Sequence, residues 1–284
     1  MPPAPDSPAA GWRGSLALDY RQRDGRTLVH DRHDGPLRVL RALYPEGGVC
    51  HSVLVHPPGG IVAGDTISIA VGLGEGAHAL VTTPGATRFY RSTGAAATQS
   101  LHVIAGTGSR LEWLPLETIA YSGCMASNAL RFELAPGAEM IGWDITALGL
   151  PESERPFEAG RFTQSIELPG RWLERGSIAA SDDRLLDSPL GWAGRRVLAT
   201  MWFASGDSLD PARSDALLDA ARSTAAAHSL ATTTGATSPQ QGVIVVRALA
   251  ARVEPAMDLL QRVWRVWRPL AWGLAATAPR VWST

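Results

Sequence analysis

Short runs of alternating apolar residues, separated by glycine and proline, fill most of the chain between residues 15 and 204. They lie at residues 16–20, 67–73, 101–103, 111–113, 130–134 and 162–168. Because side chains two residues apart lie on the same face of a strand, each run presents one apolar face to a core. The pattern predicts a mainly β protein.

The turns between these runs recur at a nearly constant interval. A glycine and a small residue precede a strand at Gly76, Gly108 and Gly137, with intervals of 108 − 76 = 32 and 137 − 108 = 29 residues. Such steps favour strands stacked in successive coils, that is, a layered β-solenoid or β-helix-like body over about residues 12–205. The simpler alternative is that any β protein has glycine turns at intervals. Stacked coils would create a long surface that can carry a groove or channel.

A smaller C-terminal region, at about residues 209–272, is expected to carry two α-helices. Asp210 as N-cap and Pro211 at the first helical position predict a helix that runs to about residue 228. A polar loop is then expected at residues 232–241, followed by an apolar strand at residues 242–250.

The second expected helix begins at Glu254 and is apolar around most of its circumference. So wide an apolar arc must be buried. Packing within the chain is the first alternative, and contact with a partner protein is the second. We name Trp264, Trp267 and Arg268 as candidate residues of a partner interface.

Composition excludes several classes of function. All 26 basic residues are arginine, so Schiff-base chemistry and a phosphate-loop lysine are excluded. A net charge of -1 gives no electrostatic footprint for nucleic acid, and no apolar run reaches the roughly 18 residues of a membrane span. Two cysteines are too few for a disulfide framework, which favours the cytoplasm. Residues 1–11 are expected to be a disordered tail before a single domain at residues 12–284.

Two motifs resemble catalytic loops but lack the necessary partners. Residues 59–66 resemble a phosphate-binding loop, yet Asp65 stands where a lysine is required and would repel phosphate. Residues 206–209 spell the Gly-Asp-Ser-Leu of one hydrolase group, but no base or orienting acid is in place, so we interpret them as a loop before a helix. The seven histidines are dispersed. We predict no catalytic residue and no stable metal site.

Carboxylates and hydroxyls at strand positions are the remaining polar candidates. The ones that we select are Asp65, Thr82, Thr83, Glu112, Asp144 and Glu174. A carboxylate among apolar strand residues is costly unless it is paired, hydrated or bound to a cation. Buried pairs with arginine are one alternative. The other is a hydrated acidic path whose oxygen ligands hold a divalent cation only weakly, which suits transit better than storage.

Several blocks of the sequence closely resemble the urease accessory protein UreD (UreH) family. They are residues 35–39, 44–47, 56–65 (HPPGGIVAGD), 82–92 (TTPGATRFYRS), 111–117 (LEWLPLE), 148–149, 157–160, 267–268 and 279–282. The resemblance extends from about residue 12 to the end of the chain. Two departures are Arg88, where lysine is usual, and Asp144, where glutamate is common.

The resemblance implies a scaffold and not an enzyme. Members of the family bind the urease apoprotein and recruit UreF, which docks the GTPase UreG. Nickel is then delivered to the urease active site, by a proposed route through a water-filled tunnel in UreD. Nickel would thus be in transit, with no tightly bound cofactor. Matched by motif, Asp65, Thr82, Thr83, Asp144 and Glu174 are expected to line that tunnel.

Two other functions remain open from the sequence. A carbohydrate-active enzyme on a β-solenoid would use paired carboxylates, for which Glu112 and Glu117 are the candidates. A purely structural interaction protein would have no ion path at all. Turnover of a glycan by the isolated chain would identify the first, and nickel binding in the presence of partners would exclude the second.

Overall fold

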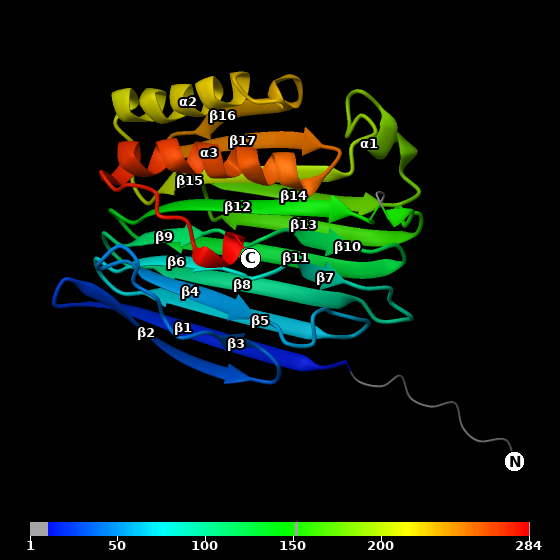
Figure 1. Cartoon of the computed structure of the whole chain (residues 1–284), viewed down its shortest axis with the longest axis horizontal. Helices are drawn as coiled ribbons and strands as arrows, with labels where there is room; N and C mark the ends of the chain where they lie inside the picture. Colours follow the sequence, from blue (N-terminus) through cyan, green and yellow to red (C-terminus); the bar gives the residue numbers. More distant parts are fainter. Residues whose placement is uncertain (1–10, 151–152, 284) are drawn as a thin grey trace, which may run out of the picture.

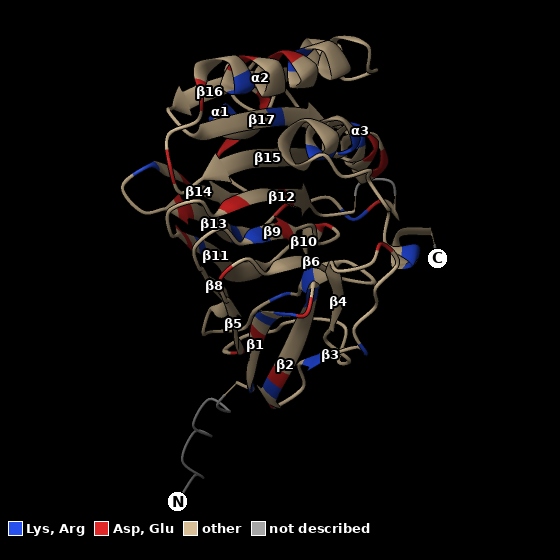
Figure 2. Ribbon diagram, turned by 90° about the vertical axis from the view of Figure 1, so that its left-hand side faces the viewer, with Lys and Arg blue, Asp and Glu red and all other residues tan. Residues whose placement is uncertain are grey.

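The strands form two sheets that pack face to face (Figures 1 and 2). The computed structural model describes residues 11–150 and 153–283. The seven-stranded sheet has the order β14-β13-β11-β8-β5-β1-β2, with bounds β1 (Arg13–Arg23), β2 (Arg26–Asp34), β5 (Thr66–Leu73), β8 (Ala97–Ala105), β11 (Cys124–Leu134), β13 (Gly160–Leu168) and β14 (Trp172–Ala179).

The second sheet has ten strands. Eight of them follow the order β16-β17-β15-β12-β9-β6-β4-β3, with bounds β3 (Arg38–Val39), β4 (Cys50–Val55), β6 (His78–Thr82), β9 (Arg110–Trp113), β12 (Glu139–Leu148), β15 (Val197–Ser205), β16 (Thr234–Gln240) and β17 (Val243–Ala250). The short strand β10 (Thr118–Ala120) pairs with both β12 and β7 (Thr87–Phe89).

The chain alternates between the two sheets and so forms a β-solenoid of about four turns, as predicted. The turns at Gly76, Gly108 and Gly137 recur once per coil. Leu73 pairs with Ala105, and Ala105 pairs with Leu134, which reproduces the steps of 32 and 29 residues (105 − 73 and 134 − 105). Successive turns also touch, because the Gly76 amide donates to the Thr107 carbonyl at 3.0 Å. Figure 1 shows the stack from β2 at one end to α2 at the other.

Two cores result from the alternation of side chains across the ten-stranded sheet. The inner core lies between the two sheets and contains Leu111 and Trp113. The outer core lies between the ten-stranded sheet and the helices α2 (Pro211–Ala226) and α3 (Val253–Trp272). A buried polar residue of the ten-stranded sheet therefore faces either the inner or the outer core.

The C-terminal region carries the two helices that the sequence predicts. The Asp210 carboxylate caps α2 and accepts from the Arg213 amide at 3.1 Å. The strand expected at residues 242–250 is β17. Shorter helical segments are α1 (Asp183–Asp187), η2 (Ala231–Thr233) and η3 (Arg280–Ser283).

The prediction of a loop at residues 232–241 is wrong, because most of this segment forms the edge strand β16. Its side chains are polar and mainly exposed, so the apolar alternation that indicates a strand is missing. Backbone pairing with β17 holds it instead. The tail predicted at residues 1–11 lies outside the described residues, apart from Gly11. Within the described ranges, no helix has the length and apolar character needed to cross a membrane.

Candidate functional site

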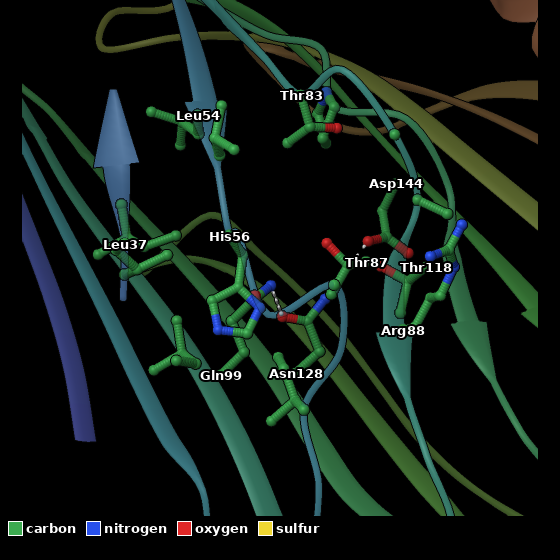
Figure 3. Close-up of a pocket in the computed structure, with 18 of the residues that line it drawn as sticks. Leu37, Leu54, His56, Thr83, Thr87, Arg88, Gln99, Thr118, Asn128 and Asp144 are labelled. Carbon is green, nitrogen blue, oxygen red and sulfur yellow. Dashed lines mark hydrogen bonds between the residues drawn. The ribbon is translucent and has the colours of Figure 1, made fainter. Parts of the chain in front are cut away.

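A cavity of about 200 Å³ opens into the inner core from one end of the sheets (Figure 3). Its polar lining comes from the strands and turns of successive coils: His56, Thr83, Thr87, Arg88, Gln99, Thr118, Asn128 and Asp144. Leucine and isoleucine side chains fill the spaces between them. The cavity is therefore a polar recess in an otherwise apolar core.

Asp144 of β12 is the buried acid of this cavity, with 6% of its surface exposed. Among the described residues, its carboxylate accepts from Asn128 Nδ2 at 3.5 Å and from Thr146 Oγ1 at 3.1 Å, and neither partner is charged. Burial, and to a smaller extent the negative charge of Glu174, raise the pKa of Asp144 to about 6. This acid thus gains and loses its proton close to neutral pH.

Two rows of polar side chains face one another across the inner core. On the seven-stranded sheet, Gln99, Asn128 and Gln164 occupy matching positions of β8, β11 and β13. On the ten-stranded sheet, Asp144 pairs with Thr200, and Thr200 pairs with Arg247, across β12, β15 and β17.

Hydrogen bonds connect members of these rows, but some buried polar atoms lack a partner. Gln99 Nε2 donates to Asn128 Oδ1 at 3.1 Å. Gln164 lies close enough to Asp144 to contribute to its pKa, yet both amide atoms of Gln164 are buried without a well-formed hydrogen bond in the described part of the chain. The same holds for Trp113 Nε1 at the cavity wall. Buried polar atoms that lack a protein partner are typical binding positions for ordered water.

Glu174 lies at the far end of the rows, on β14. It accepts from Thr200 Oγ1 at 3.0 Å and from Arg247 Nε at 2.7 Å. The Arg247 side chain is 48% exposed, which places this ion pair at the molecular surface.

The other selected residues serve different structural roles. Asp65 caps the turn before β5, where its carboxylate accepts from the Trp12 amide at 2.8 Å and the Val62 amide at 2.9 Å. Thr83 lines the cavity, whereas the adjacent Thr82 donates to the Leu114 carbonyl at 2.6 Å.

Glu112 lies on the opposite face of the ten-stranded sheet from Asp144, so it does not line the cavity. Its fully buried carboxylate binds His78 Nε2 at 2.8 Å, Trp264 Nε1 at 2.6 Å and Arg268 Nε at 3.1 Å. Burial alone would raise the pKa of Glu112, but the His78 hydrogen bond and the charges of His78 and Arg268 hold that pKa below its usual value.

The candidate interface residues Trp264, Trp267 and Arg268 belong to α3, and their side chains are fully buried between this helix and the ten-stranded sheet. The first alternative, packing within the chain, therefore holds for this helix. Contact of these three side chains with a partner would require α3 to leave the sheet. Arg268 is held in place by Glu112 and by Glu46, whose Oε2 lies 2.6 Å from Arg268 Nη1.

Sequence reasoning missed the neutral members of the polar rows and Arg247. The internal repeat could have found some of them, because Gln99 and Asn128 are 128 − 99 = 29 residues apart, one coil. Over the described ranges, no group of three or more histidine, cysteine, aspartate and glutamate side chains could hold a metal ion.

Comparison with known proteins gives the family. A family model described as UreD urease accessory protein matches residues 13–283. The chain belongs to the UreD family. Curated relatives named urease accessory protein UreD include those of Leptothrix cholodnii (56% identical over 276 residues), Paracidovorax citrulli (58% over 273) and Albidiferax ferrireducens (57% over 273). In each case the match covers 96% of this chain and 99% of the relative.

UreD proteins are accessory proteins of urease maturation and are not catalytic. The carbohydrate-active alternative is therefore wrong. Glu112, one of its two carboxylates, also has no exposed surface on which a glycan could bind.

Proposed function

We propose that this chain is the scaffold that binds the urease apoprotein and, together with UreF, positions the GTPase UreG for nickel delivery in the cytoplasm. UreG attaches through UreF, and nickel is cargo in transit. Family membership supports the role in urease maturation. The partner assignments follow from the resemblance of the sequence blocks described above.

We further propose that nickel crosses this chain along the polar rows of the inner core. The observation that carries this proposal is Asp144, a buried carboxylate that faces the cavity and has uncharged partners. A passing cation would favour its ionised form. Amide and hydroxyl oxygens nearby are weak ligands, which suits release of the ion.

Among the candidate residues, we assign Thr83, Asp144 and Glu174 to the path itself. Asp65, Thr82 and Glu112 are left out of the path, because they do not line the cavity and their oxygen atoms bind backbone or side-chain partners elsewhere. Partner contacts through α3 would use its exposed face, which includes Arg265.

The variant Asp144→Asn tests the path. It keeps the size of the side chain and an acceptor for Asn128 but removes the negative charge. After co-expression with urease, UreF and UreG, we expect roughly tenfold lower urease activity and nickel content, with unchanged co-purification of the partners. The matched control is Asp215→Asn on the exposed side of α2. Normal nickel loading in the Asp144→Asn complex would show that the path is not used.

A further inference from the structure

The far end of the polar rows has an opening beside Glu174. Gly176 lies two residues after Glu174 on the same face of β14 and pairs with Gln164, whose amide atoms have no well-formed hydrogen bond to the described residues. A Cβ added at Gly176 would meet no atom within 4 Å. The row of polar side chains therefore ends beside open space at Gly176.

Arg247 of β17 reaches Glu174 at this end of the rows. Its guanidinium binds Glu174 through both Nε and Nη2, while Thr200 holds the other carboxylate oxygen. A cation that moves from Asp144 toward Gly176 would meet a fixed positive charge at the end of the row. Glu174 is a poor ligand in this state, because both of its oxygens already accept hydrogen bonds and the guanidinium offsets its charge.

The same ion pair is free to open. With half of its side chain exposed, Arg247 can exchange Glu174 for water without any change in the strands. Solvent screens the exposed guanidinium, so the attraction between the two charges is weaker than it would be in the core. Opening would leave Glu174 as an ionised carboxylate that still accepts from Thr200, with one oxygen directed to the mouth.

We infer that Arg247 is a charged gate at the far mouth of the polar rows, which passes a divalent cation only when it releases Glu174. This inference deepens the proposed function and rests on it. An ordinary surface ion pair is the competing explanation, and the two differ in what the removal of Arg247 does to cation entry.

A cysteine placed at position 164 measures entry without nickel. The full chain with Gln164→Cys, co-purified with its partners, is treated with a cationic and with an anionic methanethiosulfonate reagent. The parent chain gives a low background, because Cys50 and Cys124 are buried and burial raises the pKa of both thiols, that of Cys124 to about 11.

Adding Arg247→Gln should raise the rate of the cationic reagent roughly tenfold, as expected when one repelling charge is removed and one carboxylate is freed. The rate of the anionic reagent should not rise. Adding Gly176→Phe should abolish the increase by filling the mouth. The control is Ser177→Phe, since the adjacent side chain lies on the outer face of the same strand.

Equal cationic rates with and without Arg247 would overturn the gate, as would a thiol that stays unreactive in both chains. This readout is separate from the test of the proposed function. If Asp144→Asn lowers nickel loading but Arg247→Gln leaves the rate of the cationic reagent unchanged, the proposed path is supported and the gate at Arg247 is refuted. If Asp144→Asn loads nickel normally, the path fails, whatever the thiol rate.

Discussion

Asp144 is a buried acid whose environment disfavours its negative charge. Its pKa is raised from 3.8 to about 6, chiefly by burial, and the nearby charge of Glu174 adds to this. Glu112 on the other face of the sheet is buried more completely, yet His78 and Arg268 hold its pKa below the usual value. One carboxylate is thus stabilised by its surroundings, and the other is kept at a cost in stability. Such a cost is typical of a functional position.

That cost can be measured as a dependence of stability on pH. Because the folded-state pKa of Asp144 lies above the unfolded value, the protonated form favours folding fully below about pH 4, and this contribution is lost as pH rises through about 6. Asp144→Asn should therefore raise the free energy of unfolding at pH 7.5 by up to ~3 kcal/mol, with little change near pH 4. Denaturant unfolding at both values checks this. A variant that is less stable at pH 7.5 would contradict it.

At the scale of elements, α3 is joined to the sheet by buried polar contacts as well as by apolar packing. Trp264 and Arg268 both bind the Glu112 carboxylate of β9, and Arg268 also binds Glu46. The helix is therefore held in one position against the sheet, which apolar surfaces alone would specify less well. The ten-stranded sheet contributes side chains to both the inner and the outer core.

Removal of the Glu112 charge should loosen α3. The variant Glu112→Gln leaves the buried Arg268 with one anionic partner fewer, and the expected loss in the free energy of unfolding is about 3 kcal/mol. The control is Arg262→Gln on the same helix, where the exposed pair with Asp258 should be worth less than about 0.5 kcal/mol. Equal effects of the two changes in denaturant unfolding would refute this account of the α3 contact.

At the scale of the whole molecule, the solenoid turns a short repeat into a long internal strip. Equivalent positions of successive coils lie in register, so one polar residue per coil is enough to build a row. The rows begin at the cavity beside Thr83 and end at Glu174. Coils from different parts of the sequence thereby contribute to one row of polar side chains.

Blocking the near end of this strip should stop transit without harming the fold. Gly85 lines the cavity, has no left-handed backbone conformation, and leaves open space where a Cβ would lie. Gly85→Phe should lower the nickel content of co-expressed urease roughly tenfold, while the melting temperature stays within a few degrees. The bulky control is again Ser177→Phe. A blocked chain that still loads urease normally would place the path elsewhere.

Much of this protein followed from its sequence. The alternation of apolar residues and the steps between Gly76, Gly108 and Gly137 determined the solenoid, because local geometry and coil length repeat with the sequence. Asp210 and Pro211 set the start of α2 by local capping. The blocks of family sequence pointed to urease maturation, and the comparisons confirmed it. The sequence did not predict strand β16, because backbone pairing holds this strand and its polar side chains show no alternating pattern.

Only the tertiary structure decided how the acidic residues are used. Alternation along a strand shows that Glu112 faces away from Leu111, but it cannot say which face meets the other sheet and which meets a helix. Pairing with residues far along the chain settled that question: Arg268 neutralises Glu112, Arg247 neutralises Glu174, and Asp144 is left with uncharged neighbours. Charge pairing depends on distances in space, and these are fixed only when the coils stack and the helices dock.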